Sequence, residues 1–145
     1  MINLHIKKIP LALLAVTLAT IGFSAPPAPQ PPTPEEALDY AKSVVWVKRV
    51  VEGGKIHSYV KEIWRFDAKA GTPPAVGSEF GIAMPYNSMM KFPERDGIVF
   101  NFGSDRPKGL PMGWGIQVAE SGMVFPFHMN VDSVRSAVKS TDPKG

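Results

Sequence analysis

Two histidines are the clearest candidates for chemistry beyond the N-terminal segment of this chain. His57 and His128 each lie on the polar side of a predicted β-strand, opposite that strand's row of apolar residues. If the two strands were neighbours, both imidazoles could bind a metal ion, with Asp67 or Glu120 as a third ligand. The two histidines are far apart in the sequence, and isolated surface histidines are commoner than metal ligands. A metal site, or a small metal-dependent hydrolase, is therefore the alternative interpretation, and no cofactor is predicted.

The sequence offers no nucleophile for covalent catalysis. The chain has no cysteine, which excludes thiol catalysis and thiolate metal sites. Ser58 follows His57 directly, but neighbouring residues of a strand point to opposite faces, so they cannot form a nucleophile–base pair. No Gly-x-Ser-x-Gly elbow is present. We therefore predict a protein that is not an enzyme.

Two irregular segments between predicted strands, 86–93 and 106–114, are the predicted contact surfaces. Met89 and Met90 would form an exposed apolar patch in the first segment. Thioethers can also hold Cu(I), but methionine serves more often as core or as an adaptable contact surface. The second segment places basic residues beside prolines, in a loop of the kind that often carries binding residues. The residues predicted to contact the partner are Tyr86, Met89, Met90, Phe92, Arg106, Lys108 and Trp114.

The first 24 residues have the three parts of a secretory signal. Lys7 and Lys8 form the positive start, 9–23 is an uncharged apolar run, and Ser24 is a small residue at the expected cleavage point. The apolar run has 15 residues, fewer than the roughly 18–20 that span a bilayer as a helix. We expect export to the periplasm or the extracellular space, with no stable membrane insertion after cleavage. Whether the signal is cleaved or kept as an anchor stays open.

Charge and export together exclude nucleic acid as a partner. Without the two lysines of the signal, the chain has 14 Lys and Arg against 13 Asp and Glu, so it lacks a strong basic excess. Basic residues, Arg49 among them, do alternate with aromatic residues in the first predicted hairpin. Trp46 and Trp64 belong to apolar rows, however, and are expected in the core. The predicted function is an exported, non-catalytic binding module whose partner is an exported protein, a peptide or a carbohydrate.

A proline-rich segment separates the signal from the predicted domain. Residues 25–34 hold six prolines, a composition that favours polyproline II and a spacer rather than a docking peptide. Thr33 is predicted to cap a short helix that ends near Ser43, with Pro34 at its first position and Glu36 at the capping-box position. The predicted boundaries are 1–24 for the signal, 25–34 for the linker, 35–141 for a single domain and 142–145 for a tail.

Six β-strands are predicted after this helix, because the apolar period changes from 3.6 to two. In the second strand Val60 and Trp64 share an apolar face that Glu62 interrupts. A bulge near Lys61 and Glu62 would turn Ile63 inward and relieve that conflict. The predicted strands are 44–51, 56–67, 80–84, 98–102, 114–118 and 123–127, with the last two paired across the turn at 120–122.

A second helix is predicted at the C-terminal end of the domain, over 130–139. Asn130 or Asp132 is its expected N-cap. Val131, Val134 and Val138 recur at helical spacing and form its apolar face.

Antiparallel strands joined by turns predict a mainly β fold without βαβ units. Six short strands in about 85 residues fit a small OB-like barrel of five to six strands flanked by two short helices, with a β-sandwich as the alternative. The chain runs Val-Val-Trp-Val-Lys-Arg-Val-Val, a glycine turn, Glu-Ile-Trp-Arg, Val-Gly-Ser-Glu-Phe-Gly-Ile, Gly-Ile-Val-Phe-Asn-Phe and Val-Asp-Ser-Val-Arg-Ser-Ala-Val. This order resembles small exported OB-fold-like domains that are similar in shape to tissue inhibitors of metalloproteinases. The resemblance implies the fold alone and not protease inhibition. Those inhibitors chelate their target's metal with an N-terminal cysteine, and this chain has no cysteine.

Overall fold

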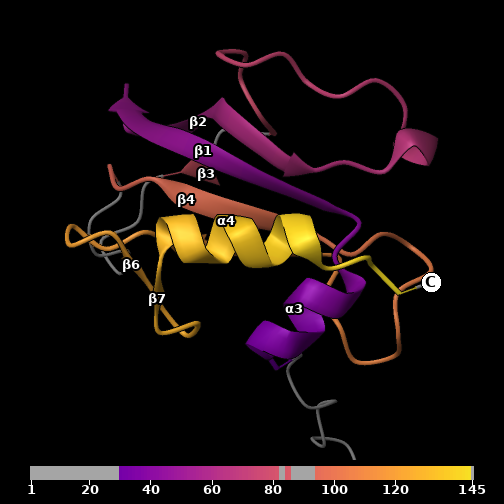
Figure 1. Cartoon of the computed structure of the whole chain (residues 1–145). Coiled ribbons are helices and arrows are strands. Elements are labelled where there is room, and N and C mark those ends of the chain that lie inside the picture. The colour runs from indigo at the N-terminus through magenta and orange to yellow at the C-terminus, as the bar shows by residue number, and fades with distance from the viewer. Residues whose placement is uncertain (1–29, 82–83, 86–93, 145) are drawn as a thin grey trace, which may run out of the picture.

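Residues 30–81, 84–85 and 94–144 are described by a computed structural model, which shows a mainly β protein with two α-helices (Figure 1). The predicted signal, most of the predicted linker and the predicted contact segment 86–93 lie outside the described residues. Within the described part, no helix is long and apolar enough to cross a membrane.

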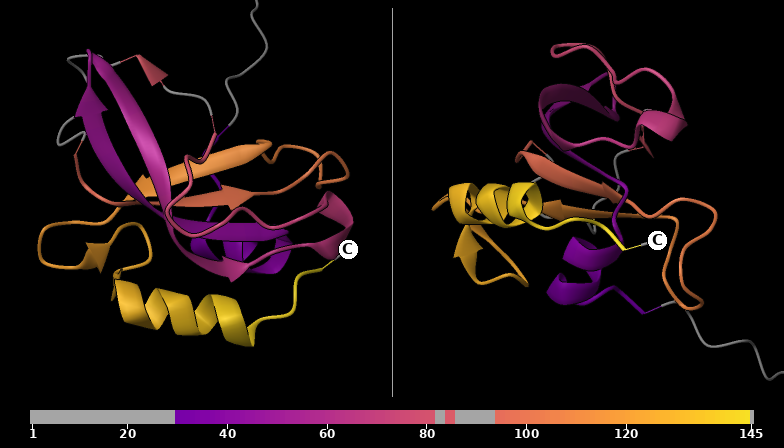
Figure 2. Two further views of the ribbon diagram at one scale, coloured as in Figure 1. Left: turned by 90° about the horizontal axis from the view of Figure 1, so that it is seen from above. Right: turned by 45° about the vertical axis from the view of Figure 1, so that its right-hand side comes forward.

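A five-stranded antiparallel sheet forms the centre of the protein, in the strand order β3-β2-β1-β4-β5. Strands β1 and β2 form a long hairpin that is strongly twisted against β4 and β5 (Figure 2). Gly53 and Gly54 form the hairpin turn with φ angles of 57° and 73°, which glycine adopts without strain. A second, two-stranded sheet pairs β6 with β7. The strands are β1 (Ser43–Glu52), β2 (Lys55–Arg65), β3 (Met84–Pro85), β4 (Gly97–Asn101), β5 (Gly113–Gln117), β6 (Met123–Val124) and β7 (Met129–Asn130).

The predicted capping of both helices is confirmed. Helix α3 (Pro34–Tyr40) begins after Thr33, whose Oγ1 accepts a hydrogen bond from the Glu36 amide, while the Glu36 carboxylate accepts one from the Thr33 amide. Helix α4 (Val131–Ser140) begins after Asn130, whose Oδ1 accepts from the Ser133 amide at 2.9 Å. The first helix ends at Tyr40, earlier than predicted, because Ser43 already belongs to β1.

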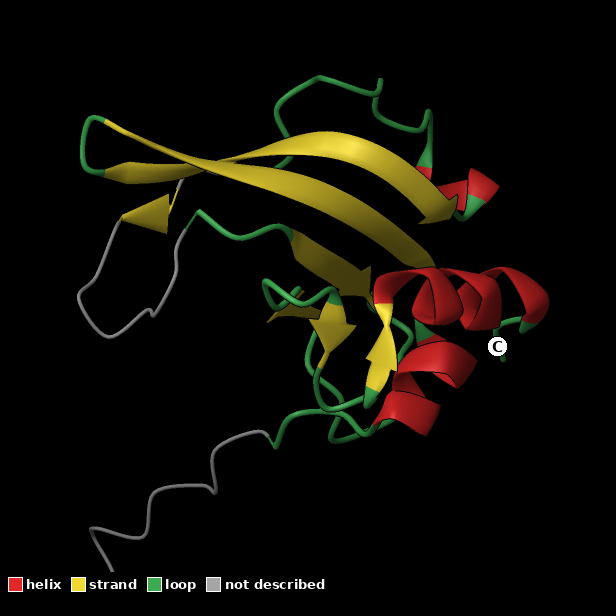
Figure 3. Cartoon of the chain, turned by 60° about the vertical axis from the view of Figure 1, so that its left-hand side comes forward, coloured by secondary structure: helices red, strands yellow, loops and turns green. Residues whose placement is uncertain are grey.

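Both helices cover the same face of the sheet (Figure 3). Val134 and Val138 of α4 are buried against it, as predicted from their spacing. The opposite face carries a smaller buried cluster of Val45, Val47 and Val60, against which Phe80 packs. The main core consists of Ala37, Ala41, Val44, Trp64, Ile98, Phe100, Phe102, Leu110, Ile116, Val118, Val124, Phe127, Val134 and Val138.

Arg65, the last residue of β2, joins the C-terminal ends of the two helices. Its guanidinium donates hydrogen bonds to backbone carbonyls at the end of each helix, where carbonyls have no partner within the helix itself. Burial lowers the pKa of Arg65, while nearby aspartates oppose that shift. The four acceptors are the carbonyl oxygens of Leu38, Ala41, Val138 and Thr141.

The bulge predicted in β2 is confirmed at Lys61. Trp46 of β1 pairs with Glu62, but the next residue of β1 pairs with Val60, so Lys61 has no residue opposite it. Ile63 consequently packs with the cluster around Val60. The prediction that Trp64 shares the face of Val60 is wrong, because the shifts in register place Trp64 on the helix-covered face beside Trp46.

The antiparallel, mainly β character and the two short helices are confirmed, but the OB-like barrel is not. The sheet ends at β3 and β5, and the residues that the structure describes form no ladder between these two edges. The predicted pairing of 114–118 with 123–127 is wrong except at Val118, which bridges Val124. The chain turns away after Val124 because Phe127 packs inward against the core. Of the predicted strand 80–84, Met84 belongs to β3, Phe80 and Gly81 belong to no strand, and residues 82–83 lie outside the described residues. The family resemblance stays a prediction.

Candidate functional site

Arg49 of β1 is a charged residue that is buried in the described structure. It is 8% exposed, and no other polar or charged residue within the described ranges is classed with the core. Strand alternation places it on the same face as Val45 and Val47, the face that the helices do not cover. A charged group in this position is unfavourable for folding unless it finds a partner.

Two glycines provide the space that the Arg49 side chain occupies. Gly97 of β4 lies opposite Val47 of β1, and Gly115 of β5 lies opposite Val99. A Cβ atom added to Gly97 would lie 2.6 Å from Arg49 Nη2, and one added to Gly115 would lie 3.5 Å from the same nitrogen. The guanidinium therefore fills the place of a side chain on β4 and extends toward β5.

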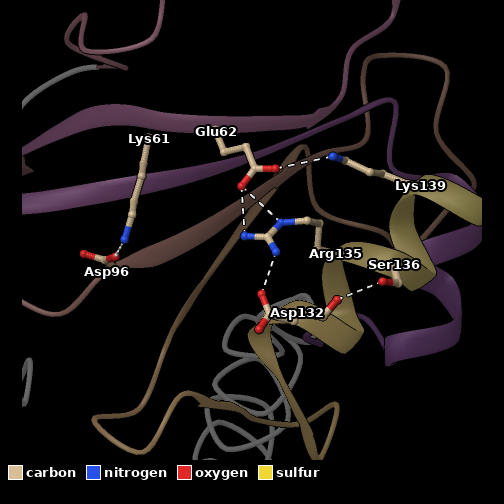
Figure 4. A network of polar contacts seen from close by, with 7 residues as sticks. All are labelled: Lys61, Glu62, Asp96, Asp132, Arg135, Ser136 and Lys139. Atoms are coloured by element: carbon tan, nitrogen blue, oxygen red, sulfur yellow. Dashed lines mark hydrogen bonds and ion pairs between the residues drawn. The ribbon is translucent and has the colours of Figure 1, made fainter.

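The fold supplies Arg49 with little compensation for its burial. Its Nε is buried and has no hydrogen-bond partner among the residues that the structure describes. Asp96 is the charged group that favours its ionised form, but the Asp96 carboxylate accepts a hydrogen bond from Lys61 Nζ at 2.9 Å (Figure 4). Burial lowers the pKa of Arg49, and Asp96 offsets only part of this. The guanidinium therefore stays a cation with hydrogen-bond donors in fixed directions, and an additional anion would stabilise it.

The side of the sheet next to this guanidinium is open. Gly113 and Gly115 of β5 are exposed. Phe102 N donates to Met112 O, and Val118 N donates to Asp96 O, so the even-numbered residues of this stretch bond to β4. The N–H and C=O groups of Gly113 and Gly115 must then point away from β4, toward the outer edge of the sheet. No described strand pairs with β5 at these two residues.

A second cluster of charges joins β2 to α4 and is satisfied within the protein (Figure 4). Glu62 accepts hydrogen bonds from Arg135 Nε at 3.1 Å and from Lys139 Nζ at 3.3 Å. Arg135 also pairs with Asp132. Lys61 Nζ lies 3.9 Å from the centroid of a Trp46 ring, a cation–π distance. Because every charge has a partner, this cluster fastens α4 to the sheet and offers no free group to a ligand.

Replacing Glu62 with glutamine is expected to change how stability depends on pH. Desolvation raises the pKa of Glu62, but hydrogen bonds from Lys139 and the charge and hydrogen bond of Arg135 outweigh it, so the pKa lies below its ordinary value. Stability from such a carboxylate is present above the ordinary pKa and is lost as the pH falls through the lowered one.

Urea unfolding at pH 7, 5 and 3 would measure this effect. The wild type should exceed Glu62→Gln by up to about 1 kcal/mol at pH 7, with the gap closing toward pH 3. Glu120→Gln is the control, because Glu120 is 92% exposed and lies 3.8 Å from Arg95. A gap that persists unchanged at pH 3 would contradict the assignment.

The predicted metal ligands are not brought together. His57 Nδ1 lies 2.7 Å from Glu79 Oε1, and its ring stacks with Tyr59. His128 lies in the turn between β6 and β7, with φ at 55° and its ring edge-on to Phe125. The two histidines thus belong to different sheets. Within the described ranges no three His, Asp or Glu side chains form a group that could hold a metal ion.

The described members of the predicted contact set divide into structural and exposed residues. Arg106 donates from Nε to Leu110 O at 2.7 Å and from Nη1 to Gly103 O, so it shapes its own loop. Trp114 is half-buried and packs 5.4 Å from the Phe100 ring. Lys108 is exposed. Four further members lie outside the described residues, namely Tyr86, Met89, Met90 and Phe92.

Surface hollows are a further class of candidate, and two of them are of similar volume. One, of about 380 Å³, lies between the start of α3 and the loop 107–110. Pro32, within the predicted linker, is buried beside it, so the packed domain includes the end of that linker. The other, also about 380 Å³, is lined by basic residues of which Lys42 pairs with Asp105 and Lys144 pairs with Asp39. Neither hollow contains a charge as deeply buried as that of Arg49.

Sequence reasoning counted Arg49 among the basic residues of the hairpin and missed its burial. The available signal was its phase, since it follows Val45 and Val47 at the two-residue period of an inward face. Comparison with known protein families, with curated proteins and with solved structures finds no match to this chain.

Proposed function

We propose that this protein is an exported, non-catalytic binding module that captures an acidic peptide segment of another exported protein through Arg49. The observation that supports this proposal is the buried guanidinium beside the exposed Gly115, because its Nε has no partner within the described ranges. A carboxylate accepts hydrogen bonds from a guanidinium in a fork geometry that no described residue supplies here. Lys108 and the segment 86–93 remain proposed contacts of the partner, separate from the Arg49 site.

A peptide fits this site better than a carbohydrate. The groups available beside Arg49 are the backbone amides and carbonyls of Gly113 and Gly115, which match the spacing of another backbone. Binding of sugars relies on aromatic platforms, and the Trp114 ring packs with Phe100 and Phe127 on the helix-covered side. The proposal therefore commits to a peptide that carries an aspartate or glutamate.

Replacing Arg49 with methionine tests the proposal through stability and binding together. A buried, poorly compensated charge destabilises the fold more than an apolar side chain of similar length. The free energy of unfolding of Arg49→Met should therefore equal that of the wild type or exceed it by up to about 2 kcal/mol. Binding should nevertheless weaken. The probe is a nine-residue peptide, acetylated and amidated, that alternates threonine and valine around one central glutamate. Calorimetry should show at least about tenfold weaker binding to the variant.

Lys48→Met is the matched control for this experiment. Lys48 precedes Arg49, is exposed and points to the opposite face of the strand, so its removal changes the net charge equally. Equal loss of binding in both variants would show that the peptide responds to net charge alone, and would contradict specific binding by Arg49. Unchanged affinity in Arg49→Met would overturn the proposed function.

A further inference from the structure

We infer that the acidic peptide binds as an added strand on the outer edge of β5, with its acidic residue opposite Gly115. This inference rests on the proposed function and specifies how the peptide is held. It assigns backbone recognition to β5 and side-chain recognition to Arg49.

The edge of β5 presents the groups that a new strand needs. Gly113 and Gly115 direct two N–H and two C=O groups outward, two residues apart, which is the repeat of a β-ladder. The strand reads Gly-Trp-Gly-Ile-Gln and contains neither charged residues nor proline. Natural sheets usually protect an exposed edge with such residues. Their absence here marks an edge that is able to accept a strand.

The face of β5 toward Arg49 provides a path for the acidic side chain. A residue opposite Gly115 directs its side chain to the face of Gly115, and paired positions lie about 5 Å apart between Cβ atoms. Gly115 itself carries no side chain, and Arg49 Nη2 lies 3.5 Å from its Cβ position. A glutamate in that register reaches over Gly115 toward the guanidinium.

Charge complementarity decides between a foreign peptide and a second copy of this chain. Two copies paired antiparallel through β5 would place both Arg49 residues on one face of a continuous sheet. The five residues of β5 contain no carboxylate to neutralise them. A peptide with one acidic residue satisfies both the backbone groups and the guanidinium, so it is the occupant we assign.

The experiment measures amide hydrogen exchange by NMR in the exported protein, with and without the glutamate peptide. Strand addition predicts that the Gly113 and Gly115 amides exchange at least tenfold more slowly with the peptide at saturation. A second peptide, N-methylated at the two residues whose amides would face β5, should bind at least tenfold more weakly. A glutamine version of the peptide should also bind about tenfold more weakly to the wild type.

The outcomes separate this inference from the proposed function. Binding that needs Arg49 and glutamate, but leaves both glycine amides unprotected and tolerates N-methylation, overturns strand addition and keeps the proposed function. Protection of both amides without any preference for glutamate keeps strand addition and overturns capture by Arg49. No binding of the glutamate peptide at millimolar concentration overturns both.

Gly115→Val examines the path between Arg49 and the acidic side chain. Valine favours the extended conformation, and its Cβ has room at this position, so the variant should fold. Its side chain would stand between the guanidinium and the peptide, and the preference for glutamate over glutamine should disappear. Gly113→Val is the control, since its Cβ would contact Phe100 O and not Arg49. Loss of the preference in both variants, or in neither, would overturn the assigned register.

Discussion

Arg65→Met is expected to lower the free energy of unfolding by about 3–5 kcal/mol. The wild-type guanidinium donates four hydrogen bonds of 2.5–2.8 Å to the ends of α3 and α4. Those carbonyls have no partner within their own helices, and a cation there also opposes the negative end of each helix dipole. Methionine keeps the packing volume but leaves all four acceptors without a donor. Urea unfolding followed by tryptophan fluorescence would give the difference.

Two further variants isolate the cause. Arg65→Lys keeps the charge but has a single ammonium group in place of a planar fork, so it should recover only part of the loss. Arg106→Met removes an arginine that donates to two carbonyls of its own loop, and should cost about 1–2 kcal/mol. If Arg65→Met proves no more destabilising than Arg106→Met, Arg65 does not hold the two helices together.

Phe100→Ala is expected to lower the free energy of unfolding by a similar amount, about 3–5 kcal/mol. Phe100 is fully buried in β4, and its ring centroid lies 5.4 Å from Trp114 and 5.8 Å from Phe127. Alanine removes one of three mutually packed rings and leaves a cavity between Trp114 and Phe127. The fluorescence of Trp114 should also shift, because its environment loses a neighbour.

Met112→Ala is the control for the change in Phe100. Met112 lies just before β5 and is 60% exposed, so its truncation should change stability by less than about 0.5 kcal/mol. A loss below about 1.5 kcal/mol for Phe100→Ala would show that the core collapses to fill the space. That result would contradict the prediction that Trp114 and Phe127 keep their places when the Phe100 ring is removed.

Local chemistry in the sequence was sufficient to predict the helices and the bulge. The Thr33 capping box and the Asn130 cap depend on residues within one helical turn. The bulge at Lys61 follows from a polar residue at an apolar phase of the same strand. Such features need no knowledge of distant segments, and for that reason they could be read directly.

Features that depend on distant segments could not be predicted in the same way. Met123, Phe125 and Phe127 alternate as a strand would, yet Phe125 is 53% exposed and Phe127 leaves the strand to join the core. The burial of Arg49 likewise depends on Gly97 and Gly115, which only the order of β1, β4 and β5 brings beside it. The candidate site therefore became visible only in the assembled sheet.

The position of Arg65 also bears on the time at which the chain can fold. Two of its acceptors precede it by 27 and 24 residues, and two follow it by 73 and 76 residues. The end of α3 can therefore be satisfied once β2 is present, but Arg65 can join it to the end of α4 only when almost the entire domain is present. A growing or translocating chain would hold the β1–β2 hairpin without a closed core, and would complete its fold only with its last helix. That order suits a chain whose N-terminal residues predict passage across a membrane before folding.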